Sequence, residues 1–267
     1  MTTLLTPPSA FQPNVVVHDE IGSTNAEAMR LALLGEAGPL WIQATRQTAG
    51  RGRSGRAWVS ETGNLTASLL TTLSCSQAIA HQVSLLAGVA VVDAVRAIAS
   101  DDRTIGGLRL KWPNDVLIGS AKLAGVLPET TITPDGRLRL VLGIGINLAW
   151  HPETLGREAT HLSEHSMDIA PESMLRHLAW AVHHWFAIWN GGAGFDTVRA
   201  AWLLRAGPVG EPIVVHLGQE RRAGHFAGLD HDGALLLETV GQTFERITFG
   251  DVTLLADVSD KGRKQDG

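Results

Sequence analysis

The 267-residue sequence contains a single cysteine, Cys75, and no run of apolar residues long enough to cross a bilayer. One cysteine cannot form an intramolecular disulfide, and the start of the chain has neither the early positive charge nor the unbroken apolar run of a signal peptide. The longest apolar run, Val83 to Val92 with Ser84 inside it, leads directly into charged residues. We therefore expect a cytoplasmic protein without a membrane-spanning segment.

Positive charge is also scarce, because 22 basic residues stand against 27 acidic ones and the net charge is −5. This balance disfavours bulk attraction to nucleic acid or to an anionic membrane. Only four of the basic residues are lysines, and two of these, Lys261 and Lys264, lie in the polar tail. A compact ammonium with three donors is not interchangeable with a guanidinium. We therefore expect Lys111 and Lys122 to occupy positions that require an ammonium group.

The length and the apolar spacing predict an α+β protein with one large domain and a small companion. Strands are expected at 15–17, 40–45, 65–73, 108–112, 116–119, 123–131 and 137–148, and helices at 24–34, 77–99, 175–189 and 197–205. Short apolar runs at 213–217, 225–229, 234–238 and 245–249 predict a small all-β module. We expect domains at 14–206 and 207–257, with flexible termini at 1–13 and 258–267.

Residues 46–56, which we call the arginine loop, contain four arginines, three glycines and no acidic residue. Glycines allow a close backbone approach, and guanidinium groups match carboxylate and phosphate oxygens, so the composition predicts an anion site. The glycines also fit G-x-G-x-x-G, but the residues after them do not continue as a helix, which argues against a dinucleotide-binding fold. A solvated loop or a nucleic-acid contact remains the alternative.

Two further segments bring together polar groups and glycines. The run from Lys111 to Asp115 places a cation, an aromatic ring, an amide and a carboxylate where proline breaks a strand, and a hairpin would point Lys122 towards the same region. An ordinary ion pair is the alternative for either lysine. The run from Gly143 to Asn147 alternates glycine with isoleucine, which leaves one face of a strand without side chains, so we expect a ligand or backbone close to that face.

The sequence from His161 to His165 matches the H-x-x-E-H zinc motif. Zinc chemistry would need a solid helix and a third ligand projecting to the same point, whereas this segment is short and polar. We therefore expect a chance match and no direct protein ligands for a metal.

Five motifs, in this order along the chain, resemble the biotin protein ligase family, also called biotin–[acetyl-CoA-carboxylase] ligases. They are Ser23-Thr24-Asn25, the loop from Gly50 to Arg56 followed by Trp58, the run from Lys111 to Asp115, Lys122-Leu123-Ala124-Gly125, and the run from Gly143 to Asn147. The resemblance covers residues 14–256 and implies a catalytic domain of the class II synthetase-like biotin/lipoate ligase type. Its mixed or antiparallel sheet would carry packed helices, and a small SH3-like β-barrel would follow.

The resemblance implies that biotin is activated with ATP and Mg²⁺ to biotinyl-5′-AMP. The biotin would then pass to a lysine of the biotin carboxyl carrier protein of acetyl-CoA carboxylase or of a related carboxylase. Family members that repress transcription carry an N-terminal helix-turn-helix domain, which this sequence lacks, so we expect no sequence-specific DNA binding. Related ligases often pair through sheet edges, and a homodimer is left open.

The resemblance also implies a set of site residues. The biotin contacts would be Ser23, Thr24, Asn25, Gln47, Gly50, Arg51, Gly52, Arg53, Lys122, Gly125 and Gly143. The nucleotide contacts would be Arg53, Arg56, Trp58, Lys111, Asn114 and Asn147, and the catalytic residues Lys122, Arg53 and Asp115. A lipoate-type protein ligase and a biotin or nucleotide sensor without turnover are the alternatives, and the presence of Arg51, Arg53 and Lys122 together favours catalysis.

Overall fold

The computed structural model describes residues 5–99, 105–153, 158–241 and 243–255, and its larger part is built on a seven-stranded mixed sheet. Its strands are β1 (Val15–Ile21), β2 (Leu40–Gln47), β3 (Leu65–Leu73), β4 (Leu108–Lys111), β5 (Asp115–Ile118), β6 (Ala121–Ile132) and β7 (Leu138–Ile146). The spatial order is β1-β2-β3-β7-β6-β5-β4, with β1 parallel to β2 and the other pairs antiparallel. The expectation of a mixed sheet is confirmed.

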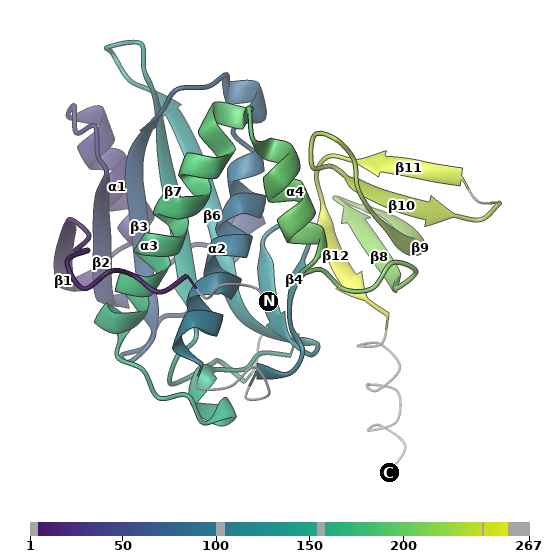
Figure 1. The fold of residues 1–267 in the computed structure, drawn as a ribbon, viewed down its shortest axis with the longest axis horizontal. Helices are drawn as coiled ribbons and strands as arrows, with labels where there is room; N and C mark the ends of the chain where they lie inside the picture. Colours follow the sequence, from purple (N-terminus) through teal and green to yellow (C-terminus); the bar gives the residue numbers. More distant parts are fainter. Residues whose placement is uncertain (1–4, 100–104, 154–157, 242, 256–267) are drawn as a thin grey trace.

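Both faces of this sheet are apolar, because successive side chains of a strand point to opposite faces. Trp41, Leu69 and Leu142 belong to the main core, which lies beneath α2 (Gln82–Ile98) and α3 (Pro171–Trp189). Their neighbours in sequence, Ile42, Leu70 and Val141, form a second core with α1 (Thr24–Leu33). The helices α2 and α3 pack side by side on one face, as Figure 1 shows, and α1 covers only part of the other.

The C-terminal part is a separate antiparallel sheet that lies beside α4 (Phe195–Leu203) in Figure 1. Its strands are β8 (Pro212–Leu217), β9 (Glu220–Leu229), β10 (Leu235–Thr239), β11 (Thr243–Ile247) and β12 (Asp251–Leu254). Their order is β11-β10-β9-β8-β12, so β11 and β12 form the edges and the described strands do not close into the expected barrel. Strand β12 pairs with β8 and was not among the expected strands.

Polar contacts join the two sheets. Arg109 of β4 donates to Glu211 at 2.6 Å, and the Trp112 indole N–H donates to the carbonyl oxygen of Gly233 at 3.2 Å. The expected flexible termini fall partly on residues 1–4 and 256–267, outside the described residues, while Phe11 packs edge-on against Trp180 of α3. Across the described residues, no helix combines the length and apolar character that spanning a bilayer requires.

Candidate active site

A cavity that is open to solvent lies over the sheet at the start of α1, and the space within it and at its mouth amounts to about 670 Å³. The expected site residues that line it are Ser23, Thr24, Asn25, Gln47, Arg51, Gly52, Arg53, Arg56, Trp58, Asn114, Asp115, Lys122, Gly125 and Gly143. Gly50, Lys111 and Asn147 are not among its lining residues. Five motifs spread over more than a hundred residues therefore meet in one place.

One wall of the cavity is a buried polar network at the start of α1. The Thr24 amide donates to Gln47 Oε1 of β2 at 2.8 Å, and Ser68 of β3 donates to Asn25 Oδ1 at 2.6 Å. Asn25 in turn donates to Glu129 Oε2 of β6 at 2.7 Å. Because each buried polar group has a partner, the side chains of this wall have fixed orientations.

The floor of the cavity consists of glycines on β6 and β7. A Cβ atom on Gly143 would lie 2.2 Å from Asn25 Oδ1, and one on Gly145 would lie 2.4 Å from the ring of Trp58. Gly125 of β6 has Lys122 and Trp58 within 3.3 Å of the corresponding position. A close approach to the glycine face is therefore present, but the groups that make it are side chains and not the expected ligand or backbone.

A buried cluster of three charges stands beside this floor. The β5–β6 hairpin places Asp115 opposite Gly125 and brings the carboxylate into contact with Lys122 Nζ. Lys111 Nζ, at the end of β4, lies 3.1 Å from the other carboxylate oxygen. Asp115 and Lys122 are both less than a tenth exposed. A buried charge must be paired, so Asp115 fixes the position of Lys122 at the cavity.

The arginine loop lies above the floor and contains only a short 3₁₀ turn, η1 (Arg53–Gly55), and an isolated bridge between Arg51 and Ala57. Arg51 donates to Glu129 at 2.9 Å, and Arg53 donates to Asn114 at 3.2 Å. Burial lowers the pKa of the Arg53 guanidinium, and nearby carboxylates, first Asp251, oppose this shift. The loop thus directs fixed positive charge at the cavity.

Asp251 connects the arginine loop to the C-terminal sheet. This residue begins β12, and its carboxylate pairs with Arg56 and lies 3.6 Å from Arg53. The Arg53 guanidinium also donates to the carbonyl oxygen of Gly250 at 3.2 Å. The second sheet therefore contributes directly to the rim of the cavity.

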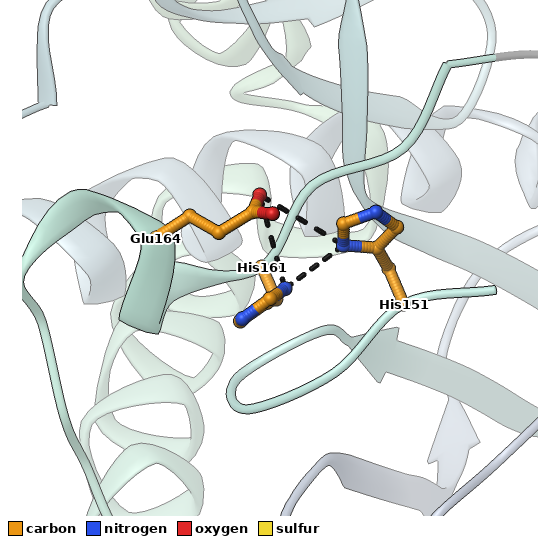
Figure 2. A group of neighbouring side chains, drawn as sticks. All are labelled: His151, His161 and Glu164. Carbon is orange, nitrogen blue, oxygen red and sulfur yellow. Dashed lines mark hydrogen bonds and ion pairs between the residues drawn. The ribbon is translucent and has the colours of Figure 1, made fainter. Parts of the chain in front are cut away.

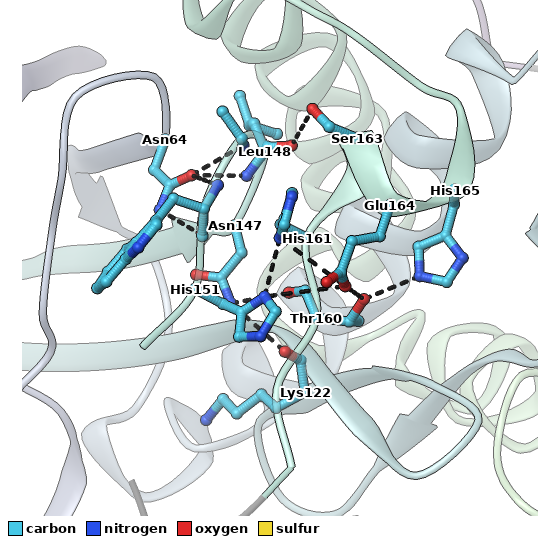
Figure 3. A network of polar contacts seen from close by, with 12 residues as sticks. Asn64, Lys122, Asn147, Leu148, His151, Thr160, His161, Ser163, Glu164 and His165 are labelled. Atoms are coloured by element: carbon cyan, nitrogen blue, oxygen red, sulfur yellow. Dashed lines mark hydrogen bonds and ion pairs between the residues drawn. The ribbon is translucent and has the colours of Figure 1, made fainter. Parts of the chain in front are cut away.

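Asn147 lies next to the cavity in a network that Figure 3 shows. Its side-chain amide donates to the carbonyl oxygens of Thr160 at 3.0 Å and Lys122 at 3.4 Å. A smaller cavity beside it has Trp58, Asn147 and Lys122 among its lining residues. Asn147 thus supports the backbone of Lys122 and lines a recess adjacent to the main cavity.

Comparison with known proteins identifies the family. Residues 22–147 match the Biotin/lipoate A/B protein ligase family. A biotin–[acetyl-CoA-carboxylase] ligase from Paracoccus denitrificans is 38% identical over 221 residues, which cover 80% of this chain and 90% of that protein. The chain belongs to the biotin protein ligase family. The resemblance drawn from the five motifs is confirmed.

Two further relatives extend the similarity. A biotin–[acetyl-CoA-carboxylase] ligase from Mycobacterium tuberculosis is 32% identical, with 88% of this chain and 87% of that protein covered. A solved structure of a biotin protein ligase from Aquifex aeolicus, in complex with biotin and ATP, has a TM-score of 0.75 at 28% identity. That alignment covers 90% of this chain and 98% of the Aquifex chain, so the family fold extends over both sheets.

Four polar residues in or beside the cavity were missed in the sequence: Thr66, Ser68, Glu129 and Asp251. Glu129 had a usable signal, because Gly125, Leu127 and Glu129 alternate along one face of β6. Ser68 lies in an apolar strand and Asp251 in a strand of four residues, and neither pattern marks a site.

Proposed function

We propose that this biotin protein ligase activates biotin with ATP to biotinyl-5′-AMP and transfers the biotin to a lysine of a biotin carboxyl carrier protein. The observation that carries the proposal is the placement of Lys122, held by Asp115 between a buried polar wall and the arginine loop. The relatives named above support the same activity, because two are biotin–[acetyl-CoA-carboxylase] ligases and the third was solved with biotin and ATP.

The polar wall and the floor would hold biotin. Ser23, Thr24, Asn25 and Gln47 are hydrogen-bonding groups at the closed end of the cavity, where they could bind a polar ring system. Arg51 and Gly52 would cover the ligand, while Gly125 and Gly143 let Lys122, Trp58 and Asn25 lie close against the strands beneath it. Gly50 would act indirectly, since its carbonyl accepts from the Trp58 amide at 2.9 Å and so shapes the loop.

The nucleotide would lie on the side of Trp58 and Asn114, next to Arg53 and Arg56. Asn147 would contribute from the adjacent recess, and Lys111 through its pairing with Asp115. Asp115 and Asp251, the carboxylates among the described lining residues, already have cationic partners. We therefore expect Mg²⁺ to be held by the phosphates of ATP and by water, where it would neutralise developing charge.

In the first step, a carboxylate oxygen of biotin attacks the α-phosphorus of ATP and pyrophosphate leaves. Negative charge grows on the α-phosphate, and the preorganised Lys122 ammonium and Arg53 guanidinium would stabilise it. In the second step, the carrier lysine amine attacks the carbonyl carbon of the mixed anhydride and AMP leaves. The arginine loop would exclude water from the anhydride between the two steps.

Biotin-dependent exchange of labelled pyrophosphate into ATP tests the proposal directly. We expect exchange with biotin, and none with lipoate at the same concentration. Exchange driven by lipoate alone would favour lipoate ligation, and binding of biotin without exchange would favour a sensor. Transfer is tested separately with a purified carrier domain and detection of its biotinylated lysine.

We also propose that the protein acts without sequence-specific DNA binding, in the cytoplasm. The net charge of −5 supports the absence of DNA binding, because DNA affinity depends largely on phosphate neutralisation by basic residues. A specific gel shift at physiological salt would contradict the proposal. Sedimentation of the protein with and without biotin and ATP distinguishes a monomer from a homodimer.

A further inference from the structure

Three potential metal ligands, His151, His161 and Glu164, point towards one another, as Figure 2 shows. The Nδ1 atoms of His151 and His161 lie 2.8 Å apart, and each lies 3.8 Å from Glu164 Oε2. His151 follows the end of β7, and Glu164 lies in the short 3₁₀ helix η4 (Leu162–His165). Two residues of the H-x-x-E-H motif, His161 and Glu164, therefore meet a histidine from outside the motif, while the motif's second histidine, His165, contacts Thr160 and is not in this group.

We propose that His151, His161 and Glu164 bind a divalent zinc-class ion, with water as a fourth ligand. In a tetrahedral site with bonds of about 2.0–2.1 Å, ligand atoms lie about 3.3 Å apart. The imidazoles would therefore separate by about 0.5 Å and the carboxylate would approach by about the same amount. Both histidines are less than a fifth exposed, while Glu164 is 45% exposed, which leaves an open side for water.

The cluster has a supporting layer of the kind that orients metal ligands. The Thr160 hydroxyl donates to Glu164 Oε2 at 2.6 Å, and its oxygen lies 2.9 Å from His165 Nε2. Thr160 is buried, so the carboxylate is aimed by a fixed group. Such contacts to metal-binding carboxylates set ligand orientation and affinity. A simple histidine pair would explain the short contact between the rings but not the oriented carboxylate beside both.

The donor set selects among ions. Two imidazole nitrogens and one carboxylate suit zinc-class ions, whereas magnesium prefers oxygen ligands and retains water. One of the two Nδ1 atoms donates its hydrogen to the other, so metal binding requires the donating ring to carry its proton on Nε2 instead. This tautomer change moves a proton within one imidazole.

A second group, Asp230, His231 and Asp232, also brings three ligand atoms together, but an arginine already pairs with its carboxylates. The Arg246 guanidinium pairs with both carboxylates, and the His231 side chain is 84% exposed. A guanidinium that fills the space between two carboxylates excludes a cation from it. This group therefore provides a matched control for histidine substitution.

Binding at the proposed site would act on the neighbouring segment. The Thr160 amide donates to the carbonyl oxygen of Lys122 at 3.0 Å. The Asn147 side-chain amide donates to the carbonyl oxygens of both Lys122 and Thr160. An ion bridging His151 and His161 would therefore fasten residues 158–162 to the end of β7 and to the strand that carries Lys122. The inference concerns metal binding and does not depend on the proposed ligation.

The test uses full-length protein without a polyhistidine tag, stripped of metal with a chelator. We expect calorimetry to show one Zn²⁺ ion bound per chain, and Co²⁺ to give the strong visible absorption of a tetrahedral site. His161→Ala and His151→Gln should each weaken Zn²⁺ binding at least 100-fold, and Thr160→Val should weaken it about 10-fold. His231→Ala should bind Zn²⁺ like the wild type, and millimolar Mg²⁺ should not compete.

The proposal is wrong if wild-type protein binds no ion in a single stoichiometric site. It is equally wrong if His151→Gln, shown to be folded by circular dichroism, keeps wild-type affinity, or if His231→Ala loses it. Zinc should also raise the unfolding temperature of the wild type but not of His151→Gln, because a ligand stabilises only the state it binds. All these measurements are made without biotin and ATP, so they are independent of catalytic activity.

Discussion

The floor of the cavity and the arginine loop above it are held by different forces. The floor belongs to β6 and β7, which have strand neighbours on both sides, and Gly143 has no space for even one more carbon atom. The loop leaves the sheet after Gln47 and is held by isolated backbone bonds and by side-chain pairs such as Arg51 with Glu129. Exposed ion pairs contribute little, so the loop can open at low cost while the floor keeps its geometry.

The largest expected effect comes from a charge fixed beside the floor. Lys122→Ala should reduce biotin-dependent pyrophosphate exchange about 100- to 1000-fold, or about 3 kcal/mol, the scale for losing one preorganised donor. Asp115 keeps Lys111 as a partner at 3.1 Å, so the variant should remain folded. Thermal unfolding provides the control. Near-normal exchange by a folded variant would remove Lys122 from the mechanism.

A pair of glycine substitutions tests whether floor and loop differ in tightness. Gly143→Ala should lower the free energy of unfolding by about 1–3 kcal/mol, because the new methyl group would overlap Asn25. Gly52→Ala in the loop should stay within about 0.5 kcal/mol, since its new methyl group would meet its nearest neighbour at an ordinary 3.4 Å. Denaturant titration measures both. Equal destabilisation of the two variants would contradict the distinction.

The loop should be the more easily opened region. Its arginines make it a trypsin substrate, so biotin with ATP should slow cleavage within residues 46–56. Asp251→Asn removes the carboxylate that pairs with Arg56 and should speed cleavage several-fold in the unliganded protein, with little change in unfolding temperature. Glu220→Gln, which breaks a surface pair with Arg222 and removes no contact of the loop, is the matched control. Cleavage rates unchanged by Asp251→Asn would mean that the pair does not restrain the loop.

The smallest expected effect concerns the β6–β7 turn, which joins two floor strands. The Thr133 hydroxyl, then the Arg137 amide and Arg139, lower the pKa of Asp135 from 3.8 to about 2. A lowered pKa means that this carboxylate stabilises the fold above pH 3.8, and that its contribution is lost as the pH falls towards about 2. The difference in unfolding temperature between wild type and Asp135→Asn should therefore shrink over that range. A constant difference would contradict the pKa shift.

Continuous apolar runs predicted the buried strands well. The expected strand at 65–73 has the observed bounds of β3, because every one of its side chains has a packed or half-buried place. The expected helix at 77–99 instead begins as a 3₁₀ turn, η2 (Gln77–Ile79), where the Ser76 hydroxyl accepts from the Ala78 amide, and α2 starts at Gln82. Strand β12 has four residues and depends on pairing with the distant β8, so local pattern could not reveal it.

The sequence predicted the cationic side chains of the candidate site, but it did not predict all of the carboxylates that pair with them. The lysines stand out because the chain has only four, the arginines because four of them fall within residues 46–56, and glycine alternation marks a close approach. Glu129 and Asp251 hold those cations, yet they come from strands far along the chain, and only sheet register and the packing of the two sheets bring them near. The histidine cluster shows the same limit, because His151 joins His161 only once β7 and η4 are placed.

The Lys122–Asp115 contact has a consequence for how ligands enter. The Lys122 ammonium already has an internal counter-anion in Asp115, so a carboxylate or phosphate that binds Lys122 as we propose would share this ammonium with Asp115. Little uncompensated charge is then left at Lys122 to attract a ligand from a distance, so capture at this residue should depend only weakly on ionic strength. Asp115 thereby keeps the buried cation in place both before and after a ligand arrives.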